Sequence, residues 1–422
     1  MFCFHPTPSH IVENIVRRHS PSNFSSLLEP SIGDGALIKG INTKNKDVTC
    51  VDIDSKRLSE LISNYANPDF ELINSDFLDI DFGERKFDFI LCNPPFNGKK
   101  LFLIEGKKLP IEAAFLNKAL ELCHKNGRLI FILPSSVTRG TRLKWFRRKV
   151  LSICNLSFSY KLPKFTFSKV EGDFSVLIFD KNSSKKKSVF RTDKSEASCN
   201  LARVTSENLS FDADEIIAQK NYYSLISNTP LKYEAVADNI EFARGKITSD
   251  YKQNGVIHTT NSAQNLFSNN NTTIFPCVEN GDWIINRVSR NLIDSLREYK
   301  GQRSPFTDCV IRLRTNNQKS SIIFFALSVM LQSKDVREIL VKGCGAKYLD
   351  LKSLQNLRIP ANLNDLYPRD YERFVAGSDH ERKIISKRVI IKLYNLNKQS
   401  IDYDKLDIES LVDKQALEME VG

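Results

Sequence analysis

The chain of 422 residues lacks the features that tie a protein to a membrane. No apolar run approaches the roughly 18 residues of a membrane-spanning helix, and the longest, SSIIFFALSVML at 320–331, has the length of a buried helix. The first residues, MFCFHPTPSHIV, lack a basic segment followed by an apolar one, so they do not indicate a signal peptide. We therefore expect a cytoplasmic protein.

Paired cysteines are also absent. The chain has nine cysteines, and none of them forms a C-x-x-C pair, so we expect no metal site. The odd number, with several cysteines inside apolar runs, predicts free thiols in a reducing compartment.

Acidic residues are in deficit, with 50 Asp and Glu against 61 Lys and Arg, a net charge of +11. This balance favours contact with a polyanion, most simply nucleic acid. Charge alone is equally compatible with a basic protein that has no such partner.

Over residues 1–181, strand-like and helix-like segments alternate, which predicts an α/β, Rossmann-like fold with a mostly parallel sheet and helices on both faces. Two further segments, NLSFSYKLP and FSVLIFDK, read as closing strands. The five strands expected before them lie in SSLLEPSIGDG, KDVTCVDID, FELINSDF, KFDFILCNPP and GRLIFILPSS, and the two clearest helices in SKRLSELISNYA and PIEAAFLNKALELCHKN.

The remaining chain divides by composition. The polar segment NSSKKKSVFRTDKSEAS opens a region, 182–224, that we expect to be a linker. Short strands interrupted by Asn, Ser and Thr clusters predict a mixed α+β domain over 225–365, and 366–422 reads as a helical tail.

The glycine turn after the first strand departs from the dinucleotide pattern. Gly33 and Gly35 are present, but Ile38 stands where the third glycine of G-x-G-x-x-G would lie, which argues against NAD. Carboxylates near a phosphate would repel it, whereas a nucleoside that carries a positive sulfonium suits them. The turn is surrounded by Glu29, Asp34 and Asp52. We therefore expect S-adenosylmethionine as the cofactor.

Two more candidate cofactor contacts follow the third strand. Asp76 can accept a hydrogen bond from an adenine amine, and Phe77 can stack on the ring. Because ligands of parallel sheets bind at the carboxyl ends of the strands, acids at successive strand ends predict one shared site.

The segment NPPF follows the fourth strand. Two consecutive prolines fix the backbone, which can hold the side-chain oxygen of Asn93 and the carbonyl of Pro94 in set directions. Both can accept hydrogen bonds from one exocyclic amine and so make its nitrogen more nucleophilic. Phe96 can stack on the base, and Pro95 completes the rigid corner. Catalysis would then rest on positioning and electrostatics.

These motifs resemble the S-adenosylmethionine-dependent N6-adenine methyltransferases of DNA in which the cofactor motifs precede the catalytic one (the γ-type order). The resemblance implies that Phe167, with Phe165 as the alternative, packs on a target adenine flipped out of the duplex. It implies cofactor contacts at Thr7, Pro8, Glu29, Gly33, Gly35, Asp52, Asp76 and Phe77, and a catalytic motif at Asn93, Pro94, Pro95 and Phe96.

Two downstream segments resemble target-recognition domains. They are EFARGKITSD at 241–250 and VKGCGAKYLDLKSLQNLRIP at 341–360. The resemblance implies that residues 225–365 select the DNA sequence.

Basic side chains near the expected cleft are candidates for phosphate contacts. Such runs are also typical of solvated surfaces. The candidates are Lys99, Lys100, Arg139 and Arg142. We expect the first two to belong to a mobile loop over 97–110.

The sequence thus predicts a site-specific adenine-N6 methyltransferase of a restriction–modification system. Double-stranded DNA is the expected partner, and the chain is expected to act alone, with any nuclease on another chain. Two alternatives stay open: an RNA base methyltransferase, because NPPF also occurs in enzymes of ribosomal RNA, and a non-catalytic DNA-binding specificity subunit.

Overall fold

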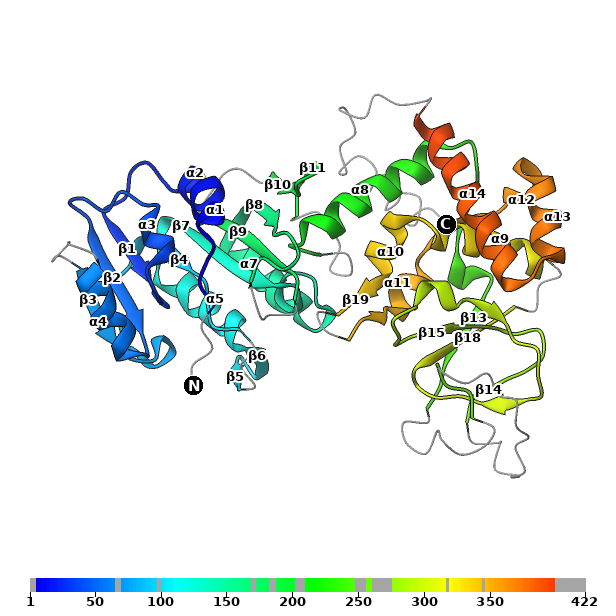
Figure 1. Cartoon of the computed structure of the whole chain (residues 1–422), viewed down its shortest axis with the longest axis horizontal. Coiled ribbons are helices and arrows are strands. Elements are labelled where there is room, and N and C mark those ends of the chain that lie inside the picture. Colours follow the sequence, from blue (N-terminus) through cyan, green and yellow to red (C-terminus); the bar gives the residue numbers. More distant parts are fainter. Residues whose placement is uncertain are drawn as a thin grey trace. The chain divides into compact units, whose positions relative to one another are not determined.

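The computed structural model describes residues 5–64, 70–96, 100–167, 172–181, 187–201, 209–246, 256–259, 275–315, 319–343 and 346–398. The contacts divide the chain into two units, with the boundary between Ile217 and Ala218 inside helix α8 (Ala213–Asn228). Figure 1 shows the helices and strands of both units.

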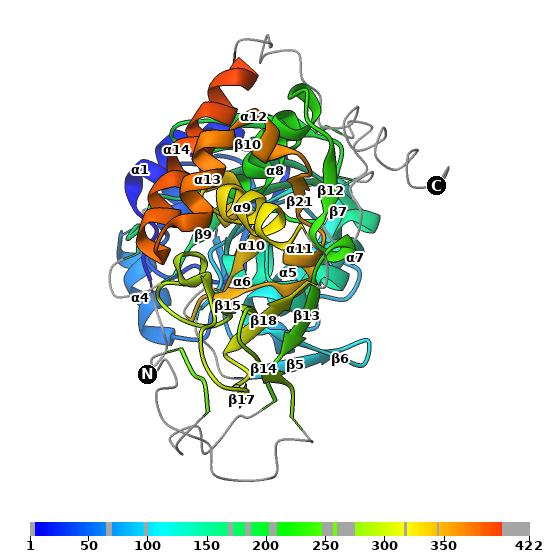
Figure 2. The ribbon, with the colours of Figure 1, turned by 90° about the vertical axis from the view of Figure 1, so that its right-hand side faces the viewer.

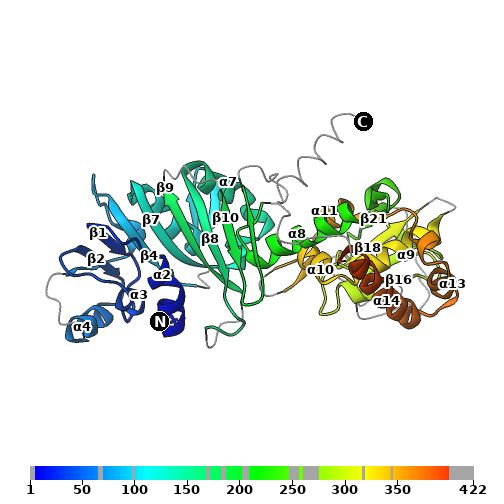
Figure 3. The same cartoon turned by 90° about the horizontal axis from the view of Figure 1, so that it is seen from above.

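The first unit is built on a nine-stranded sheet in the order β11-β10-β8-β9-β7-β4-β1-β2-β3. The five strands β3, β2, β1, β4 and β7 are parallel, and β9 is antiparallel to both β7 and β8 (Figure 3). The expected strands are present, as are the two closing ones. They are β1 (Ser26–Glu29), β2 (Asp47–Asp52), β3 (Phe70–Asn74), β4 (Phe87–Cys92), β7 (Cys123–Pro134), β8 (Cys154–Lys161) and β9 (Phe174–Lys181).

Helices cover both faces of this sheet. Because side chains alternate along a strand, β4 sends Ile90 and Cys92 into one hydrophobic cluster and Phe89 and Leu91 into the other. The predicted doubly wound α/β fold is therefore confirmed. One face carries α5 (Ile111–Leu122), α6 (Ser135–Thr138), η3 (Thr141–Leu143) and α7 (Lys144–Ile153), and the other α1 (Ser9–Ile11), the π-helical η1 (Val12–Val16), α2 (Arg17–His19), α3 (Ala36–Lys39) and α4 (Ser55–Asn64).

The region 182–224 is not a linker where the structure describes it. Strand β10 (Ser188–Arg191) pairs with β8, and β11 (Glu196–Cys199) pairs with β10, so both extend the central sheet. Phe190 is fully buried there. The charged residues around these strands conceal, at the sequence level, a short hairpin whose buried positions include Phe190, Ala197 and Cys199.

The stretch 97–110 also departs from the expected loop. Residues 97–99 lie outside the described part, and the rest forms a hairpin of β5 (Leu101–Ile104) and β6 (Lys107–Pro110). Strand β5 is a run of four apolar residues and β6 begins with two lysines, so neither has the alternation of polar and apolar residues that indicates a strand.

The second unit is mixed α+β, as its composition predicts. The apolar segment 320–331 is helix α9, and its Phe324 stacks on Trp283 of an antiparallel sheet with ring centroids 4.4 Å apart. The strands of the second unit, which belong to several small sheets, are β12 (Tyr233–Ala235), β13 (Glu241–Arg244), β14 (Cys277–Val278), β15 (Trp283–Asn286), β16 (Arg297–Glu298), β17 (Ser304–Pro305), β18 (Val310–Arg314), β19 (Val341–Lys342), β20 (Tyr348–Leu349) and β21 (Arg358–Pro360).

The helices after residue 365 belong to the core of this second unit. Val389 and Leu393 of the last described helix are fully buried in the same cluster as α9. None of the described helices is long and apolar enough to cross a membrane. The remaining elements are η4 (Val236–Asp238), η5 (Ile293–Ser295), α10 (Lys334–Leu340), α11 (Leu351–Gln355), α12 (Leu363–Leu366), α13 (Pro368–Ala376) and α14 (Asp379–Lys398).

Candidate active site

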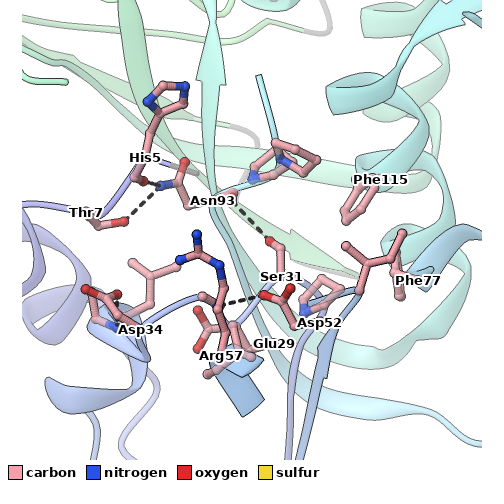
Figure 4. Close-up of a pocket in the computed structure, with 18 of the residues that line it drawn as sticks. His5, Thr7, Glu29, Ser31, Asp34, Asp52, Arg57, Phe77, Asn93 and Phe115 are labelled. Carbon is pink, nitrogen blue, oxygen red and sulfur yellow. Dashed lines mark hydrogen bonds between the residues drawn. The ribbon is translucent and has the colours of Figure 1, made fainter. Parts of the chain in front are cut away.

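One pocket collects residues from the carboxyl ends of four neighbouring strands. Asn93 follows β4, Glu29 ends β1, Asp52 ends β2 and Asp76 lies two residues beyond β3, and these strands are adjacent in the sheet. All four side chains line a pocket with an empty volume of about 980 Å³. Figure 4 shows Glu29, Asp52 and Asn93 around it. The sheet thus brings together acids that are far apart in sequence, as the strand-end argument predicts.

The glycine turn forms the floor between the first two strands. Gly33 (φ 56°) and Gly35 (φ 73°) have left-handed backbone conformations, which side chains with a Cβ rarely adopt. The Gly33 N–H donates to Asp52 Oδ2 at 2.9 Å, and the Asp54 N–H donates to Asp52 Oδ1 at 2.9 Å. Asp52 is therefore both a wall of the pocket and the anchor of the turn.

The Asn93 amide is oriented by two acceptors. Its Nδ2 donates to the carbonyl oxygen of His5 at 3.1 Å and to Thr7 Oγ1 at 3.0 Å (Figure 4). Because a carbonyl oxygen only accepts, the nitrogen must face it, and this fixes the side of the amide on which the oxygen lies. Ser31 Oγ donates to the Asn93 backbone carbonyl at 3.1 Å.

The side-chain oxygen of Asn93, unlike its nitrogen, has no hydrogen-bond partner among the described residues. This atom, Oδ1, is buried. Buried polar atoms of this kind are uncommon in folded proteins, so an oriented, unsatisfied acceptor beside a pocket points to a donor that a ligand supplies.

Glu29 provides a second unsatisfied acceptor. Its Oε2 is buried without a partner among the described residues, and only 1% of the residue is exposed. Burial, followed by the charges of Asp34 and Asp52, raises the pKa of Glu29 well above its ordinary value of 4.5. A cation placed among these three acids would relieve that cost.

Aromatic rings pack around Phe96 of the NPPF segment. Phe96 is 2% exposed and lies against the His5 ring, with centroids 5.9 Å apart and planes at 17°. Phe167 packs edge-on against Phe96 at 5.5 Å and is 3% exposed, whereas Phe165 is 85% exposed with φ 64°. Phe165 is therefore the open ring of this segment, and Phe167 is packed behind Phe96.

Most of the expected cofactor residues lie together. Pro8 and Gly35 are not among the residues that line the pocket, although Gly35 directly precedes α3 beside it. Phe167, which was expected to stack on the target base, does not line it either. Asp76 uses Oδ1 to cap the helical turn η2 (Phe77–Asp79) through the Leu78 N–H at 2.9 Å. The expected residues that line the pocket are Thr7, Glu29, Gly33, Asp52, Asp76, Phe77, Asn93, Pro94, Pro95 and Phe96.

The phosphate candidates separate into different groups. Lys99 lies outside the described residues, while Lys100 and Arg142 are exposed. Arg139 is 8% exposed and lies 3.5 Å from Glu215, so its assignment to phosphate is wrong: the guanidinium is occupied inside the protein. Burial against an acid distant in sequence leaves no trace in the local pattern.

Three site residues had no signal in the sequence. The His5 carbonyl holds Asn93, Ser31 holds the same residue from the other side, and Phe115 lines the pocket from α5. A backbone carbonyl has no sequence signature, and Phe115 lies on a helix face that reads as ordinary core.

Part of the chain is similar in sequence to known proteins. Residues 25–167 match the model of the family described as Eco57I restriction-modification methylase, about a third of the chain. A curated relative, the type II methyltransferase M.MjaVI of Methanocaldococcus jannaschii, is 33% identical over 75 residues. That match covers 16% of this chain and 39% of the relative, so the chain spans well under half of the relative's length.

Solved structures show weaker likeness. The methyltransferase subunit of a type I restriction-modification system from Streptococcus thermophilus is 19% identical, with 51% of this chain and 53% of that chain covered and a TM-score of 0.41. The type IIG restriction endonuclease BpuSI is 13% identical, with 95% and 67% covered and a TM-score of 0.47. Likeness at this level does not bear on function.

The sequence matches support a methyltransferase domain of the restriction–modification type, followed by an additional domain. S-adenosylmethionine is the cofactor that this family implies. The acidic pocket, with its buried and unsatisfied Glu29 oxygen, suits a ligand that carries positive charge.

Proposed function

We propose that this chain is a site-specific DNA methyltransferase that modifies the exocyclic N6 amine of adenine. The observation that carries the proposal is the Asn93 amide, whose nitrogen is held by His5 and Thr7 and whose buried oxygen has no partner among the described residues. An amine with two hydrogens is the donor that such an oxygen lacks.

The cofactor residues fall into two groups by their chemistry. Glu29 and Asp34 would supply negative charge for the sulfonium and ammonium groups, while Asp52 would hold the ribose and Asp76 with Phe77 the adenine ring. S-adenosylmethionine supplies the methyl group when it is bound. These residues would hold it in the pocket that Asn93 also lines.

Asn93 would then act on the substrate amine. Its Oδ1, together with the Pro94 carbonyl, accepts the two amine hydrogens, which returns electron density to the nitrogen and fixes its direction. Ser31 donates a hydrogen bond to the Asn93 backbone carbonyl, and Thr7 accepts a hydrogen bond from the Asn93 side chain. The Asn93 oxygen therefore needs little reorganisation during the reaction.

The target base of a duplex is inaccessible in the stack, so the proposal includes extrusion of the adenine. Phe96 lies next to the acceptor, but its ring is already packed against His5 and Phe167. We assign stacking on the extruded base to Phe165 rather than Phe167, because only Phe165 offers an open face.

The remaining parts of the proposal follow from the restriction–modification context. Residues of the second unit select the DNA sequence, the chain works in the cytoplasm of a bacterium or archaeon, and a separate endonuclease cuts the same site. The described cysteines Cys50, Cys92, Cys123, Cys154, Cys199, Cys277 and Cys309 are free thiols, which is typical of a reducing compartment.

The test is transfer of a labelled methyl group from S-adenosylmethionine by the purified chain. We expect labelling of duplex DNA and none of ribosomal RNA. Labelling of RNA alone would favour the RNA base methyltransferase. No binding of S-adenosylmethionine in a calorimeter would favour a non-catalytic specificity subunit.

The raised pKa of Glu29 predicts a pH-dependent stability. Because the folded protein keeps this carboxyl protonated above pH 4.5, the associated stability is fully present below that pH and is lost as pH rises toward the raised pKa. Replacing Glu29 by Gln should therefore raise the melting temperature of the ligand-free protein by a few degrees at about pH 8, and by little at about pH 5. Thermal unfolding at both pH values measures it, and a difference that does not change with pH would contradict the assignment.

The two phenylalanines predict different phenotypes. With 2-aminopurine at the target position, Phe165→Ala should lower the fluorescence gain on binding at unchanged stability, because base–aromatic stacking contributes about 1–3 kcal/mol. Phe167→Ala should instead destabilise the protein by about 3–5 kcal/mol, because it leaves a cavity behind Phe96. Equal fluorescence in Phe165→Ala and wild type would remove the stacking role from Phe165.

A further inference from the structure

The β5–β6 hairpin stands between two stretches of the pocket wall. Phe96 lines the pocket four positions before Lys100, and Ile111, which directly follows Pro110 at the end of β6, lines it again. The hairpin base is thus at the rim of the site, and its body projects from the first unit (Figure 2).

The hairpin turn is tight and regular. Glu105 (φ 51°) and Gly106 (φ 72°) both have left-handed backbone conformations, as in the two-residue turn that suits the twist of paired strands. The register pairs Leu103 with Lys108 and Leu101 with Pro110. Directly opposed residues share a face, so the hairpin has one face with Leu101, Leu103 and Lys108.

The opposite face is attached to the protein. Leu109 is fully buried in the main cluster, and Lys107 lies 4.5 Å from the centre of the Trp145 ring. Glu105 at the turn pairs with Lys149 of α7 at 2.7 Å. These contacts hold the turn and β6 against the first unit, so the free face has a defined position.

The free face is apolar and carries positive charge on one border. Leu103 is 73% exposed and Leu101 43%. Lys108 lies directly across from Leu103, and Glu105, the one acid of the hairpin, is already paired with a lysine. Lys100 belongs to the other face, where its Nζ lies 4.9 Å from the centre of the Phe102 ring. Bulky apolar side chains beside a lysine complement a duplex, whose stacked bases are apolar and whose phosphates are negative.

We propose that this hairpin is a wedge that enters the DNA beside the target adenine. Leu103 inserts into the base stack at the step that the extruded base leaves, and Lys108 contacts a flanking phosphate. The wedge rests on the proposed function, because it requires duplex DNA as the substrate. A protein partner fits less well, since such a surface would not need a lysine directly across from its most exposed leucine.

The test compares Leu103→Ala with Leu103→Met, which keeps the apolar bulk. On a duplex with 2-aminopurine at the target, Leu103→Ala should lose most of the fluorescence gain, and its kcat/KM for a paired target should fall about tenfold. Leu103→Met should stay near wild type. On a target adenine opposite an abasic site, where less pairing has to be broken, Leu103→Ala should recover to within about twofold of wild type.

The possible outcomes distinguish the wedge proposal from the proposed methyltransferase function. Both variants should have the melting temperature of the wild type, because the Leu103 side chain is exposed. If wild type methylates the duplex and Leu103→Ala matches it on paired and unpaired targets alike, the wedge is overturned and the methyltransferase stands. If wild type itself does not act on a duplex, the proposed function fails first.

Discussion

Replacing Asn93 by alanine is expected to lower methyl transfer by about a hundredfold to a thousandfold, while the affinity for S-adenosylmethionine stays within about twofold. The loss is large because the Asn93 oxygen is the oriented acceptor of the site, with its amide nitrogen held by His5 and Thr7. Steady-state kinetics with calorimetric binding measures both quantities. Parallel loss of binding and transfer would show that Asn93 only supports the pocket.

Two further substitutions make this prediction specific. Asn93→Asp is almost isosteric, but it places an oxygen against the His5 carbonyl and Thr7 Oγ1, where a nitrogen now donates. We expect a loss comparable to that of alanine. Thr7→Val removes one of the two acceptors and should cost about tenfold in kcat, because a typical hydrogen bond contributes about 0.5–1.5 kcal/mol. A Thr7→Val enzyme with wild-type kcat would mean that the amide needs no orientation.

Asp52→Ala is expected to raise the KM for S-adenosylmethionine by tenfold or more, since a hydrogen bond to a charged group contributes about 1.5–3 kcal/mol. The structure adds a second cause, because the same carboxylate accepts from the Gly33 and Asp54 amides. The substitution therefore removes the proposed ribose acceptor and also loosens the glycine turn. An unchanged KM would refute the assignment of Asp52.

Asp52→Asn separates these two causes. Asparagine keeps one oxygen for the backbone amides but places an NH2 group where the other oxygen now accepts. We expect its KM to lie between wild type and alanine. If Asn and Ala are equally impaired while both melt with the wild type, charge rather than turn geometry governs binding.

The sequence predicted the parts of this site that depend on strand order. Glu29, Asp52, Asp76 and Asn93 each follow or end an apolar run, and parallel strands align their carboxyl ends, so their meeting could be inferred without coordinates. Gly33 and Gly35 were equally predictable, because a turn between strand and helix requires left-handed backbone there.

The remainder depends on contacts between distant residues. Arg139 reads as a surface charge until Glu215, far along the chain, is seen beside it. The Asn93 side chain is oriented by a hydrogen bond from its Nδ2 to the backbone carbonyl of His5. Every residue type has such a carbonyl, so the sequence does not reveal this contact. Phe165 and Phe167 are identical letters two positions apart, and only packing against Phe96 distinguishes them.

The central claim is that the Asn93 oxygen serves an adenine amine, and the modified nucleoside in DNA tests it most directly. DNA from cells that express the chain would be digested and analysed by mass spectrometry, with single-molecule sequencing to locate the modified sites and cells carrying Asn93→Ala as the control. We predict N6-methyladenine at one recurring sequence in wild type and none in the control. Methylated cytosine in place of methylated adenine, or N6-methyladenine that persists with Asn93→Ala, would contradict the account.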